Sequence, residues 1–384
     1  MSVVSIRGEG VSEYLARTCA DSRMRDNLMY HGAGTGRWSG RGAQLQNLPS
    51  RFVVTKEQIN LAIDWITKDC SGDDIRMWMG SPLEIISACL KGMIVAPPGK
   101  ELIASDYKSI EAVGTAWLAG AKNLLGVFHR GEDPYLYQAS HIYKLPLSSM
   151  SKETHPFERQ LGKVAVRSLG YKMGADKFEA TCFKERIVIT SKEARDAVTA
   201  YRESNPEIPE LWQDLHDGAI EAVNNPEKIV WCADGRIAFL RTGTWLYMRL
   251  PSGRRLSYAR PRIEKVECPW EDKNTGLPAR RRAVTYWGKN SVTHQWTRQI
   301  GYGGRWTENA VQGLSACILR EAMLRLEDAG YEMILSVHDE PVAEVDEGFG
   351  SVAEFEQIMC ASEPWAAGMP VAADGGWRGK RYRK

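Results

Sequence analysis

Closely spaced cysteines are missing from this sequence, and so is a marked excess of either charge. Eight cysteines are spread over 384 residues, and no two lie closer together than Cys70 and Cys89. Without a CxxC motif we expect neither a zinc ribbon nor a dense disulfide framework, and free thiols fit a reducing cytoplasm. Lysine and arginine number 50 against 48 acidic residues, a net charge of +2. Near neutrality still allows a basic groove beside acidic outer faces, so a nucleic-acid partner is not excluded.

Long apolar runs and a secretion signal are also lacking. No stretch approaches the roughly 18 consecutive apolar residues of a transmembrane helix. The N-terminus, MSVVSIRGEGVSEY, does not have the basic-then-apolar order of a signal peptide. We therefore expect no membrane partner and a cytoplasmic location.

The composition is that of a globular protein with a sizeable core. Hydrophobic residues make up 43% and charged residues 26% of the chain, which excludes collagen-like, disordered and coiled-coil proteins. The hydrophobic pattern predicts helices at 56–68, 82–90, 110–118 and 308–328, a helical region at 133–224, a strand at 101–106, short β-strands between 229 and 306, and two strands at 333–345. We expect an α+β fold of two or three packing units.

Carboxylates end two of the predicted strands. Asp106 follows an apolar strand, and Asp339 and Glu340 form a tight acidic turn between the last two strands. Adjacent carboxylates repel each other unless a cation neutralises them. Two divalent metal ions need carboxylates from separate elements, and magnesium needs only two or three of them because it keeps several waters. The alternative is a solvated acidic turn and an unrelated aspartate.

A basic stripe lies on the predicted helix that begins at Pro156. Arg159, Lys163 and Arg167 are spaced by four residues, with Tyr171 four further on, so they share one helix face. Like charges at this spacing destabilise a helix by a few tenths of a kcal/mol. The stripe is therefore typical of a site for a triphosphate or a nucleic-acid backbone. A solvated basic face is the alternative.

These elements, in this order, resemble the family A DNA polymerases, the group of bacterial DNA polymerase I and many phage replicative enzymes. Four segments carry the resemblance: TGRWS at 35–39 with LQNLP at 45–49, SDYKSIE at 105–111, the Arg159–Lys163–Tyr171 spacing, and VHDE at 337–340. Gln312-Gly313 also matches. Three further segments, at 250–255, 302–305 and 365–368, resemble phage members. The resemblance runs from about residue 30 to the C-terminus.

The resemblance implies roles for individual residues. It implies metal-binding carboxylates at Asp106 and Asp339, with the Tyr107 carbonyl as a further ligand and Glu340 as an auxiliary acid. It implies nucleotide contacts from Arg159, Lys163, Tyr171 and Tyr135, with Lys163 as a proton donor to the leaving group and Glu111 as a steric gate under the ribose. It implies primer–template contacts from Arg37, Asn309, Gln312 and His338. The cofactor would be two Mg²⁺ ions, with Mn²⁺ as an alternative.

The implied architecture is an antiparallel palm sheet with helices and a mostly helical fingers subdomain that carries a β-type insertion. The predicted segments are an N-terminal segment and TGRW loop at 1–50, palm at 51–128, fingers at 129–300, and palm with a basic C-terminal tail at 301–384. About 30 residues precede the TGRW segment, so no thumb or exonuclease domain is expected. Departures from the family pattern are Arg167 in place of an aromatic or aliphatic residue, Lys172 in place of a small one, and Tyr135 in place of a histidine.

The implied reaction is template-directed addition of dNTPs to a primer 3′-hydroxyl. Primer–template DNA and dNTPs would be the partners, with a separate thumb and exonuclease chain or a processivity factor as a further candidate. Three alternatives stay open: half of a split polymerase, a non-catalytic nucleic-acid-binding subunit, and a relative of the single-subunit RNA polymerases. Glu111 argues against the last, because a bulky acid there blocks a 2′-hydroxyl. The intact Asp106 and Asp339 argue against a non-catalytic subunit.

Overall fold

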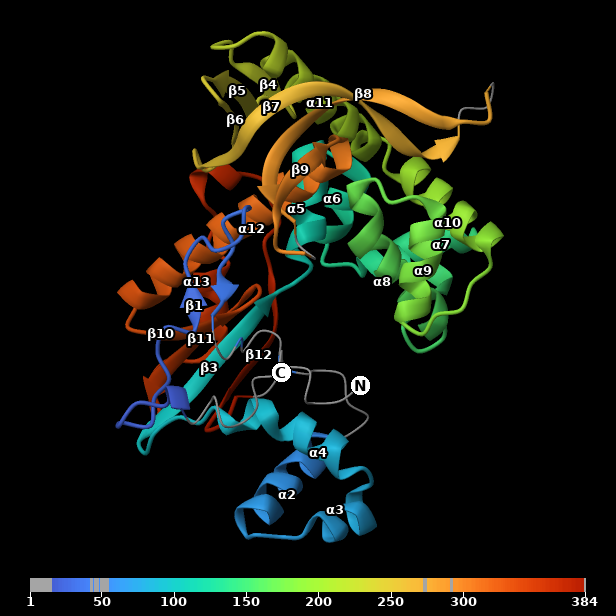
Figure 1. Ribbon diagram of the computed structural model, residues 1–384. Helices are drawn as coiled ribbons and strands as arrows, with labels where there is room; N and C mark the ends of the chain where they lie inside the picture. Colours follow the sequence, from blue (N-terminus) through green and yellow to red (C-terminus); the bar gives the residue numbers. More distant parts are fainter. Residues whose placement is uncertain are drawn as a thin grey trace. The chain divides into compact units, whose positions relative to one another are not determined.

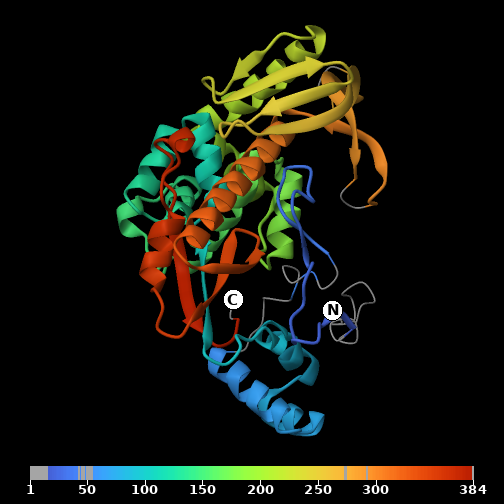
Figure 2. The ribbon, with the colours of Figure 1, turned by 90° about the vertical axis from the view of Figure 1, so that its left-hand side faces the viewer.

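The computed structural model describes residues 16–41, 44, 48, 55–271, 275–290 and 293–382. The chain forms two compact units (Figures 1 and 2). The first unit contains the described residues up to Lys108, residues 319–361 and those from Ala372 onward; the second contains 109–318 and 362–371. Each unit is described by itself.

A four-stranded antiparallel sheet forms the centre of the described part of the first unit. Its strands, in spatial order, are β10 (Glu332–Val337), β11 (Glu340–Asp346), β3 (Lys100–Tyr107) and β12 (Ala373–Gly379). Successive strand residues point to opposite faces. Leu102 and Ala104 join an apolar cluster on one face. On the other face, the Ser105 hydroxyl donates to Glu356 of α13 (Val352–Met359), and the Tyr107 hydroxyl donates to the carbonyl of Met359.

A small helical module precedes β3. It consists of α2 (Lys56–Thr67), α3 (Gly72–Met79) and α4 (Pro82–Cys89). Thr55 and Ser71 each begin a helix with a capping box, and α4 starts with a proline at its first position. Side chains from all three helices meet in one apolar cluster: Ala62, Ile75, Ile85 and Cys89.

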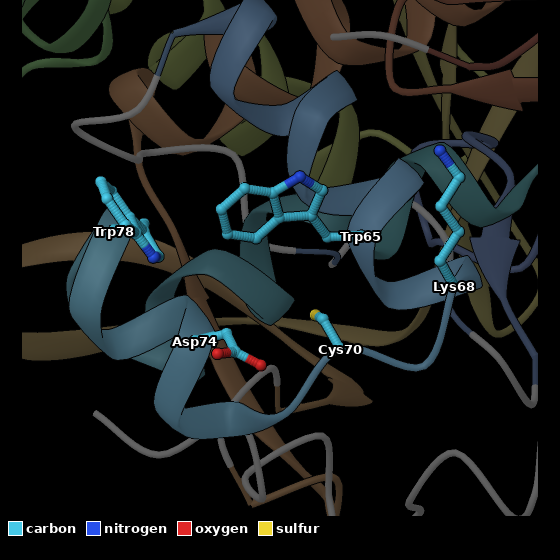
Figure 3. Close-up of a pocket in the computed structure, with 5 residues that line it drawn as sticks. All are labelled: Trp65, Lys68, Cys70, Asp74 and Trp78. Atoms are coloured by element: carbon cyan, nitrogen blue, oxygen red, sulfur yellow. The ribbon is translucent and has the colours of Figure 1, made fainter.

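A cavity of about 270 Å³ opens on this module (Figure 3). Its lining residues come from α2, the turn after it and α3: Trp65, Lys68, Cys70, Asp74 and Trp78. None of the site residues predicted from the sequence lines this cavity.

The second unit begins with a helical part. Its helices are α5 (Ile110–Ala119), α6 (Lys122–His129), α7 (Pro134–Tyr143), α8 (Pro156–Ser168), α9 (Ala175–Lys184), α10 (Ser191–Ser204) and α11 (Glu207–Asn224). Their apolar faces share one core that includes Leu161, Phe178 and Trp212. The Trp212 indole also donates a hydrogen bond of 2.7 Å to the Gly170 carbonyl, which joins α11 to the turn after α8.

An antiparallel sheet follows, with six strands in the described part of the second unit. Its strands pair in chain order: β4 (Val230–Cys232), β5 (Ile237–Thr242), β6 (Trp245–Arg249), β7 (Arg255–Glu271), β8 (Pro278–Lys289) and β9 (Trp296–Gly301). The 17-residue β7 and the 12-residue β8 form a ribbon much longer than the other strands (Figure 1). The fully buried Trp306, at the start of α12 (Gly303–Asp328), packs edge-on against Phe239 and Tyr258.

The structure confirms the predicted α+β class and the predicted helices and strands, with small shifts of their ends. It also contains α3, α6, α13 and β12, which the pattern did not predict. α12 begins at Gly303, so residues 303–306 are helical and not part of the predicted β-strand region. The helix that begins at Pro156 ends at Ser168, so Tyr171 lies beyond it in a 3₁₀ turn, Leu169–Tyr171, and the predicted shared helix face stops at Arg167. Within the described residues, no helix combines the length and apolarity that crossing a membrane requires. The four predicted segment boundaries stay predictions.

Candidate active site

Asp106 and Asp339 lie at the same edge of the first unit's sheet. β3 and β11 are antiparallel, and Ala104 pairs with Val342. The last residues of β3 therefore lie beside the first residues of β11, where the turn that contains Asp339 begins. Both aspartates are half-buried. The sequence predicted that these two strand ends meet, and the sheet brings them together.

Arg37 faces this acidic edge. Its guanidinium lies 3.5 Å from the Asp339 carboxylate, and both side chains are about one quarter exposed. Gly36, with φ +82, allows the tight turn that precedes Arg37. The neighbouring His338 is exposed and also has a left-handed backbone, with φ +56. The matched residues 45–47 and 49 lie outside the described part of the chain.

Glu340 points away from solvent. It is 2% exposed and accepts a hydrogen bond of 2.5 Å from the Tyr382 hydroxyl. Its other oxygen accepts one of 3.3 Å from the Trp377 indole. Burial of a carboxylate is costly without such donors, so these two bonds fix the start of β11. The basic C-terminal segment is therefore partly packed, with Trp377 in β12 and Tyr382 buried.

A third carboxylate, Asp374, lies at the same edge and was missed from the sequence. It is exposed and pairs directly with Asp106 across β12 and β3. Directly opposite residues in an antiparallel pair share one face. No pattern in the Gly- and Arg-rich stretch around Asp374 predicted a strand, so nothing pointed to this proximity.

The donors at this edge fit a hard divalent cation. Carboxylate oxygens of Asp106 and Asp339 are the ligands that Mg²⁺ prefers, and few are needed because waters complete its shell. The Arg37 guanidinium already balances Asp339 with positive charge. The side chain of Tyr107 is buried toward α13, so only its backbone carbonyl could be a ligand. Among the described residues, no three His, Cys, Asp or Glu side chains form a ready-made metal cluster.

In the second unit, the predicted nucleotide-binding cations gather around one tyrosine. The Arg159 guanidinium lies 5.2 Å, and the Lys163 ammonium 5.9 Å, from the centre of the Tyr135 ring. Asp133 orients Arg159 through an ion pair of 2.6 Å. The same carboxylate caps α7 by accepting from the backbone amides of Tyr135 and Leu136. The role of Asp133 as a partner of Arg159 was not predicted from the sequence.

Glu111 and Tyr171 also meet in the second unit. The Tyr171 hydroxyl donates a hydrogen bond of 2.7 Å to the Glu111 carboxylate. One turn earlier, Ser109 and Tyr135 share a hydrogen bond of 2.8 Å between their hydroxyls. The N-terminal end of α5 is thus joined to both α7 and the turn after α8. Arg167, on the same helix as Lys163, is exposed.

Asn309 and Gln312 lie three residues apart on α12, on one face of the helix. The Asn309 amide donates a hydrogen bond of 3.0 Å to the Tyr258 hydroxyl. Burial raises the pKa of Tyr258 far above its ordinary value, so this hydroxyl stays protonated. Asn309 is therefore held by β7, and Gln312 is half-buried one turn along the helix.

Comparisons with known proteins agree on one family. The model of "DNA polymerase family A" matches residues 9–225. The DNA polymerase of Bacillus phage SP02 is 35% identical over 369 residues, which are 95% of this chain and 54% of the relative. The thermostable DNA polymerase I of Thermus aquaticus is 23% identical over 259 residues, 66% of this chain and 24% of the relative.

A solved structure has a similar fold. The POL domain of Pol1 from M. smegmatis, in complex with a DNA primer-template and dNTP, aligns with a TM-score of 0.58 and 20% identity. The alignment covers 97% of this chain and 50% of that one. The chain thus spans about half the length of the phage relative and of this structural neighbour.

Proposed function

Because this chain belongs to DNA polymerase family A, we propose that it adds dNTPs to a primer 3′-hydroxyl under the direction of a template. The observation that carries the proposal is the placement of Asp106 and Asp339 at one edge of one sheet. In the same chain, a cationic cluster around Tyr135 and the Glu111–Tyr171 pair supply the residue types that a deoxynucleoside triphosphate needs.

Asp106 and Asp339 would hold two Mg²⁺ ions, or Mn²⁺, with the Tyr107 carbonyl as a further ligand. Such ions activate the primer hydroxyl and neutralise charge on the phosphates. Arg37 balances Asp339 and would give way to a metal ion there. Glu340 acts indirectly in this proposal: its bonds to Tyr382 and Trp377 fix the strand that begins beside Asp339.

Arg159 and Lys163 would bind the triphosphate. A guanidinium can bind two phosphate oxygens at once, and Asp133 keeps that of Arg159 in place. The Lys163 ammonium can donate a proton to the departing pyrophosphate, which then leaves as a weaker base. Tyr135 presents its ring to both cations and its hydroxyl to Ser109, so it would orient the phosphates rather than react.

Glu111 and Tyr171 would select the sugar. The hydrogen bond between them fixes the Glu111 carboxylate. A carboxylate fixed under C2′ leaves no room for a 2′-hydroxyl, and the Tyr171 ring would face the base pair. Discrimination by a fixed group is stronger than by a mobile one, because a mobile side chain can move aside.

Arg37, His338, Asn309 and Gln312 would contact the primer–template duplex. Acceptors in the minor groove are common to all base pairs, so such donors can test base-pair shape without reading sequence. A separate thumb and exonuclease chain, a processivity factor and a cytoplasmic location stay predictions.

Primer extension by the full chain tests this proposal. A labelled primer on a template with one unpaired base is incubated with each of the four dNTPs in Mg²⁺. We expect addition of the complementary nucleotide only, and none in EDTA. No extension, or extension that ignores the template base, would overturn the proposal.

A further inference from the structure

The β7–β8 ribbon of the second unit concentrates positive charge. Its two strands carry eight Lys and Arg residues and three Glu residues, whereas the whole chain has a net charge of only +2. The rest of the chain is therefore slightly acidic. None of the residue roles considered above uses the charged residues of this ribbon.

The arrangement of these charges is costly for the ribbon alone. Lys265 and Arg282 lie directly opposite each other, and both are exposed. Like charges at such positions destabilise a strand pair. The next pair on the same face, Glu267 and Arg280, forms an ion pair of 2.7 Å, so the two charges neutralise each other. Within the described residues, Lys265 and Arg282 make no ion pair. Since successive strand residues point to opposite faces, this pair lies on the face opposite to Arg281.

Two exposed tryptophans lie beside other cations, Arg281 and Lys289, which are an even number of residues apart on β8 and therefore point to the same face. Trp270 is 50% exposed, and the guanidinium of Arg281 lies 5.6 Å from its ring centre. Trp296 is 60% exposed and lies directly opposite Lys289. Exposed indoles beside cations are the parts of a single-strand binding surface, because an unpaired base can stack on the ring while the cation meets the phosphate. In a duplex the bases are already stacked, so the indoles would have no partner there.

The face of the ribbon that carries Arg281 lies toward Tyr302 and the turn after α8. Arg281 also lies 5.7 Å from the centre of the Tyr302 ring. Its charge, together with that of Arg202, adds to burial in lowering the pKa of Lys172, the residue after Tyr171. In the described part of the chain, no ion pair joins Lys172, Arg202 or Arg281 to a carboxylate. Arg281 and Arg202 thus lie close enough to act on Lys172, the residue next to Tyr171, with Asp217 as an opposing charge.

We propose that one face of the β7–β8 ribbon, together with the start of β9, binds single-stranded DNA, with Trp270 and Trp296 stacking on bases and Arg281 and Lys289 contacting phosphates. The identification of this single-stranded DNA as the unpaired template rests on the proposed function. The binding of single-stranded DNA itself does not rest on the proposed function.

Fluorescence anisotropy with a labelled 20-nucleotide oligo-dT and the full chain tests the binding over a salt series. Arg281→Ala/Lys289→Ala should remove two phosphate contacts and reduce the slope of log K against log salt by about 1.4. Trp270→Ala and Trp296→Ala should each weaken binding roughly 5- to 100-fold at one salt concentration and leave that slope unchanged.

Two matched controls accompany these variants. Lys192→Ala/Arg195→Ala on α10 removes the same charge from an exposed helix face, and Trp78→Ala removes an indole that is 72% exposed on α3. Both controls should bind like the wild type, and all variants should keep the wild-type thermal midpoint. Wild-type affinity and slope in the ribbon variants, or equal losses in the controls, would overturn the proposal. An equal loss for a blunt 20-base-pair duplex would also overturn it, because the ribbon would then bind duplex.

Primer extension separates this proposal from the proposed function. Templates with one unpaired base should be used equally well by wild type and ribbon variants, while templates with a ten-base overhang should bind the variants less tightly. A chain that binds oligo-dT through the ribbon but extends no primer would overturn only the polymerase function. If the wild type extends primers but the ribbon variants bind oligo-dT normally, only the proposed binding of single-stranded DNA by the ribbon would be overturned.

Discussion

The Tyr171 hydroxyl donates a 2.7 Å hydrogen bond to the Glu111 carboxylate, which joins the turn after α8 to the start of α5. A glutamate on a helix surface usually samples several rotamers. This bond selects one of them, and Tyr171 is itself held in a 3₁₀ turn whose Gly170 carbonyl accepts from Trp212. The carboxylate is therefore placed by two successive contacts within the second unit.

Shortening Glu111 should relax sugar selection. Glu111→Ala removes the group that would clash with a 2′-hydroxyl. Since forcing an extra group into a packed site costs about 1–3 kcal/mol, the ratio of kcat/KM for rNTP over dNTP should rise roughly 10- to 100-fold. Tyr171→Phe keeps the Glu111 carboxylate but removes the hydrogen bond that fixes it. The rNTP-over-dNTP ratio of kcat/KM for Tyr171→Phe should therefore lie between those of the wild type and Glu111→Ala. Steady-state kinetics with matched ribo- and deoxynucleotides measure both, and an unchanged ratio in Glu111→Ala would place the gate elsewhere.

Removing the Lys163 ammonium should impair catalysis more than DNA binding. In the proposed role, Lys163 meets the triphosphate and protonates pyrophosphate, so Lys163→Ala should lower the single-turnover rate about 100-fold or more. Its affinity for primer–template should stay within about twofold of wild type. Lys184→Ala, an exposed lysine on α9, is the charge-matched control. Loss of DNA binding with a normal rate on the bound fraction would contradict this role.

The contact between Tyr382 and Glu340 should contribute to stability. Tyr382→Phe removes a donor from a buried carboxylate that also accepts from the Trp377 indole, and hydrogen bonds to charged groups contribute about 1.5–3 kcal/mol. The free energy of unfolding of this unit, measured with urea, should fall by about that amount. Tyr30→Phe, which changes an exposed tyrosine, should have no effect. Equal midpoints for Tyr382→Phe and wild type would show that the bond contributes little.

Local sequence patterns predicted most of the helices and strands, because such patterns depend on residues that are close together in the chain. The strand that ends in Asp106 and the hairpin around Asp339 follow from alternation and turn residues, and a shared sheet brings them together. The end of α8 at Ser168 depends on Gly170 and on contacts with a distant helix, so spacing alone extended it too far. The strand near Trp377 has a Gly- and Arg-rich composition that is typical of a tail, and it is ordered by contacts with residues distant in the sequence, such as its pairing with β3 and the bond from Trp377 to Glu340.

Single-nucleotide incorporation by aspartate variants tests whether Asp106 and Asp339 hold the metal ions for nucleotide addition. Asp106→Asn and Asp339→Asn keep the size of each side chain but remove its charge, whereas Asp346→Asn makes the same change at the far end of β11, where Lys100 is the partner at 2.9 Å. The measurement is the single-turnover rate of dNTP addition in Mg²⁺, with folding checked by the thermal midpoint. We expect a loss of at least about 100-fold for Asp106→Asn and Asp339→Asn and a normal rate for Asp346→Asn. A near wild-type rate in either of the first two would contradict this assignment.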